Sequence, residues 1–280
     1  MSRLNAYQKS CIAFLFVLLI FWGYLFTTGT KSGSLNYIFA LMYALMPFLG
    51  GIAAIRGYQE WGGLSTILGK AILFLGLGLF MWGFGKIAWV YYAAIPGIQN
   101  ASLPDWFFAP SVFLYTIGTI YLSLTTGIRL SLKFTSGRIF AIVTPIVVFI
   151  LAYYVLIALP KADIDTLISN KDTILRSIFN IAYPIGDAVS LAVAAVVAGL
   201  SFRYLGGLYK TEIVFILTGL AGMFAADSYF AYSSLVGTSY IGGTGDLLYA
   251  FALFLLTCGL LGFNKFRKAV PAPAPAPIAQ

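Results

Sequence analysis

Ionisable side chains that lie inside or beside long apolar stretches of the sequence include those of Lys86, Asp105, Asp187, Asp227 and Asp246. A charge is costly in such a setting and persists mainly where it is paired or functional. Lysine supplies an ammonium for ion pairs and cation–π contacts, and aspartate supplies an acceptor that also carries protons in acid–base work. The sequence therefore predicts one polar cluster in a very apolar protein as the candidate functional site.

Helical spacing indicates which of these side chains share a face, because residues three or four positions apart lie on one side of a helix. Trp82, Lys86 and Trp89 form one stripe, and Tyr183 and Asp187 form another. Both stripes combine a charge with aromatic rings. We therefore expect aromatic side chains to form the walls around the buried charges.

The candidate site follows if the helix that carries Lys86 packs toward the later helices. Its ammonium then meets Asp187 or Asp227 among tyrosine and tryptophan rings, in a network that opens to the outer side of the membrane. The candidate ligand-binding residues are Lys86, Asp187, Asp227, Tyr183, Trp82, Trp89, Tyr232, Asp105 and Asp246.

Simpler roles are open for the same charges. Asp105 and Asp246 each stand at the start of an apolar stretch, where a carboxylate caps a helix. Lys86 lies shortly before Pro96, so its long side chain can extend to the lipid headgroups. A buried ion pair that only fixes the helix packing is an alternative for all of them.

The elements that must position these residues are membrane-spanning helices. The chain has 280 residues, of which 60% are hydrophobic and 9% are charged, far from the balance of soluble domains. Apolar stretches long enough to cross the hydrocarbon predict an all-α, polytopic membrane protein with eight transmembrane helices. Their ranges are about 10–28, 36–55, 68–92, 110–127, 138–159, 180–202, 211–232 and 246–263.

An internal repeat relates the two parts of the chain. Residues 78–118 and 219–259 align without a gap at an offset of 141, with nine identical positions out of 41. We expect two similar four-helix halves, 1–135 and 136–268, related by a pseudo-twofold axis normal to the membrane, and an exposed Pro/Ala-rich tail, 269–280.

The distribution of basic residues predicts the orientation. Twelve of the 17 Lys and Arg residues fall on the side of the two termini, and four fall on the opposite side. We therefore expect a multi-pass protein of the cell membrane with cytoplasmic N- and C-termini and with the buried charges toward the outer leaflet. The net charge of +8 then indicates attraction to anionic membrane lipids and not a nucleic-acid interface.

Catalysis has little support in the composition. The chain contains no histidine, and its two cysteines, Cys11 and Cys258, lie inside predicted spans without a metal-binding motif. We expect no metal, no cofactor and no enzymatic activity. An intramembrane enzyme that uses the Asp187 and Asp227 carboxylates is a remote alternative.

Several segments, taken in order, resemble a known family. Residues 78–92 and 102–108 look like the first signature of the multi-helix membrane sensor region that precedes output domains in bacterial and archaeal signalling proteins. Tyr-Pro-Ile-Gly-Asp at 183–187 is similar to its second motif, and residues 226–232 and 243–249 are similar to its third. Lys86 departs from the pattern, in which a Glu or Gln is expected.

The resemblance implies a sensory input module, which in relatives lies ahead of diguanylate cyclase, phosphodiesterase or histidine kinase domains. No output domain follows Lys268 in this sequence, so we expect a signal to pass to a separate cytoplasmic protein. The expected function is a sensor-like module that binds a small molecule or lipid in an outward pocket. The alternatives are a small-solute or ion transporter or channel, and a structural, lipid-interacting membrane protein.

Overall fold

The computed structural model of the chain describes residues 4–95, 102–126, 128–154, 158, 174–201 and 210–263, and these are helical with short connections. No strand occurs in these ranges, which confirms the all-α prediction. The helices are α1 (Ala6–Thr27), α2 (Ser34–Gly57), η1 (Tyr58–Trp61), η2 (Gly63–Ser65), α3 (Ile67–Ala94), α4 (Ser102–Leu124), α5 (Ile128–Ser131), α6 (Thr135–Tyr153), α8 (Ile174–Ser201), α9 (Lys210–Leu235) and α10 (Thr244–Phe263).

Seven helices in the described ranges are long and apolar enough to cross a membrane: α1, α2, α3, α4, α6, α9 and α10. The chain thus has the character of a multi-pass, membrane-embedded protein, as predicted. Helix α8 covers the sixth predicted span, and its segment Ala188–Leu200 is apolar. The predicted tail, 269–280, lies outside the described residues.

Helix α4 differs most from its predicted range, because it begins at Ser102 and not near residue 110. Pro104 lies in the first turn, where a missing N–H breaks no intrahelical hydrogen bond. The early start brings Asp105 into the first turn of the helix. Residues 102–109, which were expected to precede the helix, therefore belong to α4.

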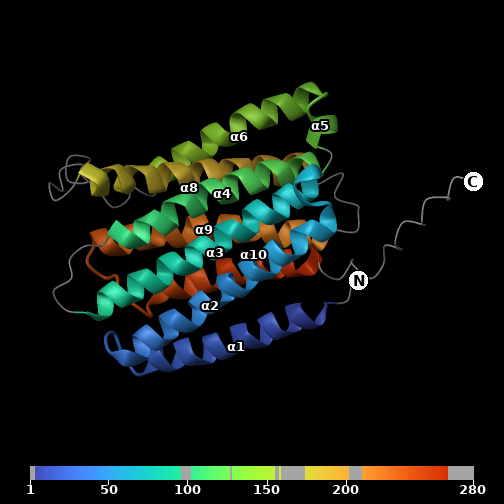
Figure 1. Ribbon diagram of the computed structural model, residues 1–280. Helices are drawn as coiled ribbons and strands as arrows, with labels where there is room; N and C mark the ends of the chain where they lie inside the picture. Colours follow the sequence, from blue (N-terminus) through green and yellow to red (C-terminus); the bar gives the residue numbers. More distant parts are fainter. Residues whose placement is uncertain are drawn as a thin grey trace, which may run out of the picture.

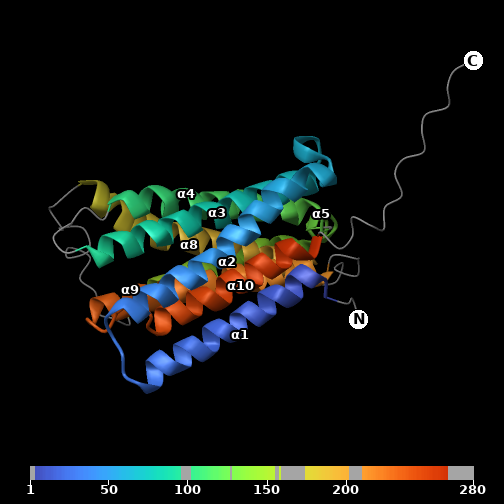
Figure 2. The same ribbon diagram turned by 60° about the horizontal axis from the view of Figure 1, so that its bottom comes forward.

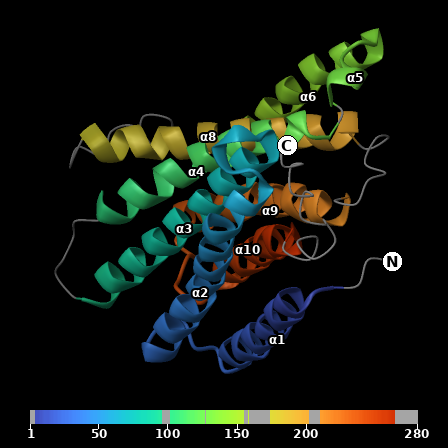
Figure 3. The same cartoon turned by 45° about the vertical axis from the view of Figure 1, so that its right-hand side comes forward.

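The long helices run side by side in one bundle (Figure 1). Helix α3 packs against α2, α4 and α10, and α10 packs against α9, α2 and α1. Helix α1 lies at one edge of the bundle, and α6 lies at the other edge against α8 (Figures 2 and 3). Helices α3 and α10 therefore each contact several neighbours in the interior of the bundle.

Helix directions place the predicted charges at one end of this bundle. Lys86 is late in α3 and Asp227 is late in α9, whereas Asp105 and Asp246 are in the first turns of α4 and α10. The end of α3, the end of α9 and the start of α10 lie together, opposite the start of α1 and the end of α10 (Figure 1).

Close backbone approach holds the inner helices together. A Cβ added to Gly51 of α2 would lie 2.8 Å from the carbonyl oxygen of Gly76 in α3. Glycine therefore permits a helix separation that any side chain would prevent. The outer surface is apolar, and Ile142 and Ile150 on α6 are 65% and 64% exposed. Such a surface suits contact with lipid chains better than contact with water.

Candidate ligand-binding site

A buried ion pair joins α3 to α10. The Lys86 Nζ lies 2.8 Å from Oδ1 of Asp246, and the two residues are only 6% and 7% exposed. Opposite charges from two separate membrane-type helices thus meet near one end of the bundle, as the sequence predicted. The residue that supplies the negative charge is not the predicted one.

Lys86 pairs with Asp246, whereas Asp187 and Asp227 were the predicted partners. The reason is the order of helices around α3, which packs on α10 and so presents Lys86 to the start of that helix. Asp227 instead accepts a hydrogen bond from the Tyr249 hydroxyl, 2.5 Å from its Oδ1. The first turn of α10 therefore supplies the partner of Lys86, and Asp227 takes part in a separate contact.

The Asp246 carboxylate accepts three hydrogen bonds. Its Oδ1 accepts hydrogen bonds from Lys86 Nζ and from the Tyr43 hydroxyl, the latter at 2.6 Å. Its Oδ2 accepts a hydrogen bond from the backbone N–H of Gly242 at 2.7 Å. The residue also lies in the first turn of α10, where the helix dipole favours a negative charge. Asp246 is therefore the ion-pair partner of Lys86, and its backbone hydrogen bond goes to the turn before α10 and not to the first N–H groups of that helix.

Aromatic rings surround the pair, as the Trp82–Lys86–Trp89 stripe predicted. The Lys86 Nζ lies 5.1 Å from the centroid of the Tyr43 ring, which is a cation–π contact. Trp82 is buried beside them, with its ring 6.1 Å from that of Tyr43 and 5.4 Å from that of Tyr249. These contacts hold the lysine side chain inside the bundle and exclude the headgroup-directed alternative.

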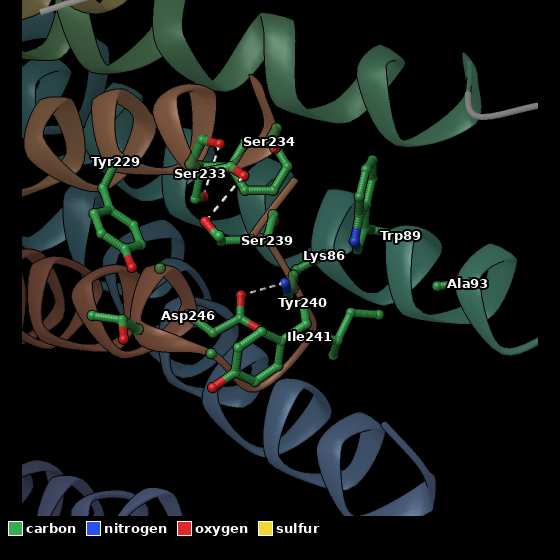
Figure 4. Close-up of a pocket in the computed structure, with 15 residues that line it drawn as sticks. Lys86, Trp89, Ala93, Tyr229, Ser233, Ser234, Ser239, Tyr240, Ile241 and Asp246 are labelled. Carbon is green, nitrogen blue, oxygen red and sulfur yellow. Dashed lines mark hydrogen bonds and ion pairs between the residues drawn. The ribbon is translucent and has the colours of Figure 1, made fainter. Parts of the chain in front are cut away.

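A cavity of about 250 Å³ lies beside the ion pair, and both of its residues line the cavity. Its walls come from late α3, the end of α9, the turn between α9 and α10, and the start of α10. Figure 4 shows Lys86 and Asp246 pointing toward each other on one side, with Ser233, Ser234 and Ser239 across from them. The lining residues are Lys86, Trp89, Ala93, Tyr229, Phe230, Ser233, Ser234, Thr238, Ser239, Tyr240, Ile241, Gly243, Thr244, Gly245 and Asp246.

The other predicted site residues lie apart from this cavity or are not described at side-chain level. Asp105 borders a separate apolar groove on α4 with Trp106 and Phe113. Tyr232 is 38% exposed on α9 and does not line the cavity. The side chains of Tyr183 and Asp187 on α8 lie outside the described residues. The cavity thus brings together Lys86, Trp89 and Asp246 from the predicted set, and Trp82 is buried beside them without lining it.

Two groups of residues at this site were not predicted from the sequence. Tyr43, a hydroxyl in the middle of an apolar span, was a signal for a buried polar partner. The second group consists of the hydroxyl residues that line the cavity at the end of α9 and in the following turn, Ser233, Ser234, Thr238, Ser239 and Tyr240. Their density in a short turn between two spans was visible in the sequence.

Comparison with protein-family models, with curated proteins and with solved structures finds no match to this chain. Function is therefore inferred from the geometry of the site.

Proposed function

We propose that this chain is a sensor-like module of the cell membrane that binds a ligand in the cavity lined by the Lys86–Asp246 pair. The observation that carries the proposal is a buried cation and its counter-ion in the wall of a cavity lined with hydroxyls and aromatic rings. Sites with a few convergent polar groups in an otherwise apolar wall are typical of ligand binding. A pair that only fixed the packing would not need a cavity beside it.

The proposed architecture has eight spans, with α8 as the sixth, in two halves of similar structure. Matching glycine contacts support the repeat. A Cβ on Gly118 would lie 2.6 Å from Cγ of Leu75, and a Cβ on Gly259 would lie 2.6 Å from Cγ1 of Ile216. Both members of the second pair follow those of the first by 141 residues, the offset of the sequence repeat.

A second pair of contacts supports the same offset. A Cβ on Gly78 would lie 2.6 Å from Tyr115, and a Cβ on Gly219 would lie 2.7 Å from Leu256. Helix α3 packs on α4 as its counterpart α9 packs on α10. Likewise, α2 contacts α10 as its counterpart α8 contacts α4. Equal contacts at equal offsets are expected of two halves related by a pseudo-twofold axis.

Transmission follows from the position of the ion pair in this architecture. Lys86 belongs to the first half and Asp246 to the second, so the pair lies across the junction between them. A ligand that contacts either charge changes the free energy of that junction and so favours one packing of the halves over another. We propose that the opposite ends of α3 and α10, which face the cytoplasm in the orientation given by the basic residues, pass this change to a separate signalling protein.

The proposal is tested by ligand screening on the purified protein in detergent micelles. Small polar compounds and lipids are scored for an increase in the thermal unfolding temperature, since a ligand that binds only the folded state stabilises it. Stabilising compounds are then tested on Lys86→Met and Asp246→Asn. The matched control is Lys70→Met on the same helix, away from the cavity. Ligands whose effect survives both site variants, or a protein that no compound stabilises, would refute the proposed site.

One observation favours a transporter as the second candidate function. Buried hydroxyl residues follow one another at helical spacing along α4 and in the turn after it, from Ser111 through Tyr115, Thr119 and Ser123 to Thr126. A polar row of this kind can form part of a path through a bundle. Four of the five hydroxyls donate to carbonyls of the same helical segment, which closes the row in this state. Ligand uptake into vesicles reconstituted with the protein would favour this candidate over the sensor.

A further inference from the structure

We propose that the ligand of the cavity carries an oxoanion, a carboxylate or a phosphate, that accepts hydrogen bonds from Lys86 Nζ. This inference depends on the proposed function, because it names the chemistry of the ligand in the same cavity. It does not depend on where the ligand comes from. A lipid headgroup and a free small anion present the same oxygen atoms.

Lys86 has more hydrogen-bond donors than the described part of the folded chain uses. An ammonium has three N–H groups. One donates to Asp246, and the Tyr43 ring supplies a cation–π contact. In the part of the chain that the structure describes, Lys86 Nζ has no other acceptor. Because the residue is only 6% exposed, its remaining donors need an acceptor that enters the cavity.

Asp246, in contrast, does not need a hydrogen-bond donor from the ligand. Its two oxygens already accept from Lys86, Tyr43 and Gly242. A cationic ligand would have to displace one of these donors and would also approach the lysine charge. An anionic ligand displaces nothing, because it uses donors of Lys86 that Asp246 leaves over. The pair therefore presents donors to the cavity more readily than acceptors.

The rest of the cavity wall adds further hydrogen-bond donors. Gly243, Thr244 and Gly245 at the start of α10 line the same cavity as Lys86. The first N–H groups of a helix have no intrahelical acceptor and carry a partial positive charge. Ser234 and Ser239 add hydroxyls on the facing wall. An oxoanion beside Lys86 thus enters a cavity with further donors and a favourable helix terminus.

The test titrates the full chain in a neutral detergent with sodium phosphate or sodium acetate, with the ionic strength held constant by sodium chloride. The thermal unfolding temperature gives the apparent affinity. We expect phosphate or acetate to stabilise the protein, and Lys86→Met to weaken this effect at least about tenfold, as loss of a hydrogen bond to a charged group does. Lys86→Arg, which keeps the charge, should retain most of it, and Lys70→Met should not change it.

A variant of the counter-ion gives the sharper readout. Asp246→Asn removes the carboxylate that competes for the ammonium, so oxoanion binding should become tighter by about threefold or more. A ligand that instead bound through Asp246 would bind more weakly to this variant. If Lys86→Met does not fold, the double variant Lys86→Met/Asp246→Asn, which carries neither charge, takes its place and should bind no oxoanion.

The source of the anion is distinguished by reconstitution in nanodiscs of phosphatidylcholine with or without phosphatidylglycerol. Stabilisation that requires phosphatidylglycerol and Lys86 identifies a lipid headgroup, and stabilisation by free phosphate or acetate identifies a soluble anion. Both results support the inference. If glycerol or choline stabilises the protein through Lys86 and Asp246 while no oxoanion does, the inference is overturned and the proposed function stands. If no probe stabilises the protein, both are overturned.

Discussion

A double-mutant cycle on Lys86 and Asp246 measures how much the ion pair stabilises the fold. Lys86→Met leaves the Asp246 carboxylate buried with Tyr43 and Gly242 as its remaining donors. Asp246→Asn leaves a buried ammonium without a counter-ion among the described residues. The double variant carries neither charge. The cycle therefore compares two variants that each keep one unpaired charge with the wild type, in which the charges are paired, and with the double variant, which has neither charge.

The magnitude follows from the burial of the pair. Removal of one partner from a buried pair costs about 3–5 kcal/mol. We expect the low end, about 3 kcal/mol for each single variant, because the pair borders a cavity. In Lys86→Met the Asp246 carboxylate also keeps two other hydrogen bonds. The double variant should lose about 2 kcal/mol less than the sum of the single variants.

The assay is equilibrium unfolding in mixed micelles, followed by circular dichroism. Lys70→Met is the control, because Lys70 Nζ lies 5.6 Å from the centroid of the Tyr121 ring and has no ion pair in the described ranges. It should cost about 0.5 kcal/mol. Additive effects of the two site variants would refute the reasoning, because they would mean that the two charges do not stabilise each other in the folded protein.

Two further predictions use pairs of similar residues in different surroundings. Tyr43→Phe should lower the free energy of unfolding by about 2 kcal/mol, because the Tyr43 hydroxyl donates to a charged carboxylate. Tyr115→Phe should be neutral or stabilising, because the Tyr115 hydroxyl has no hydrogen-bond partner among the described residues. Equal losses in thermal unfolding would contradict this. Gly118→Ala and Gly259→Ala should each cost about 1–3 kcal/mol, since the added Cβ meets the neighbouring helix at 2.6 Å, whereas Gly23→Ala, with nothing within 4 Å, should stabilise α1 by up to about 1 kcal/mol. If the first two glycine variants unfold at the temperature of the wild type, the close helix contacts are wrong.

The transmembrane character and the positions of the helices were readable from the sequence because they depend on local composition. A stretch of apolar residues of sufficient length forms a spanning helix whatever its neighbours are, so the ranges of α2, α3 and α10 agree with prediction to within three residues. The end of the bundle at which the charges gather was also predictable. Successive spanning helices run in opposite directions, so the position of Lys86 late in its span indicates the end of the bundle near which it lies.

The sequence alone thus determined an all-helical protein with long apolar helices and a lysine and an aspartate at one end of the bundle. It did not determine which aspartate meets Lys86, because helices that are apolar on every side carry no periodic signal of which face meets which neighbour. Only the tertiary structure gave that answer. Packing of α3 on α10 brought Asp246 within 2.8 Å of Lys86 Nζ, and the same packing left a cavity beside the pair, since both depend on contacts between residues 160 positions apart.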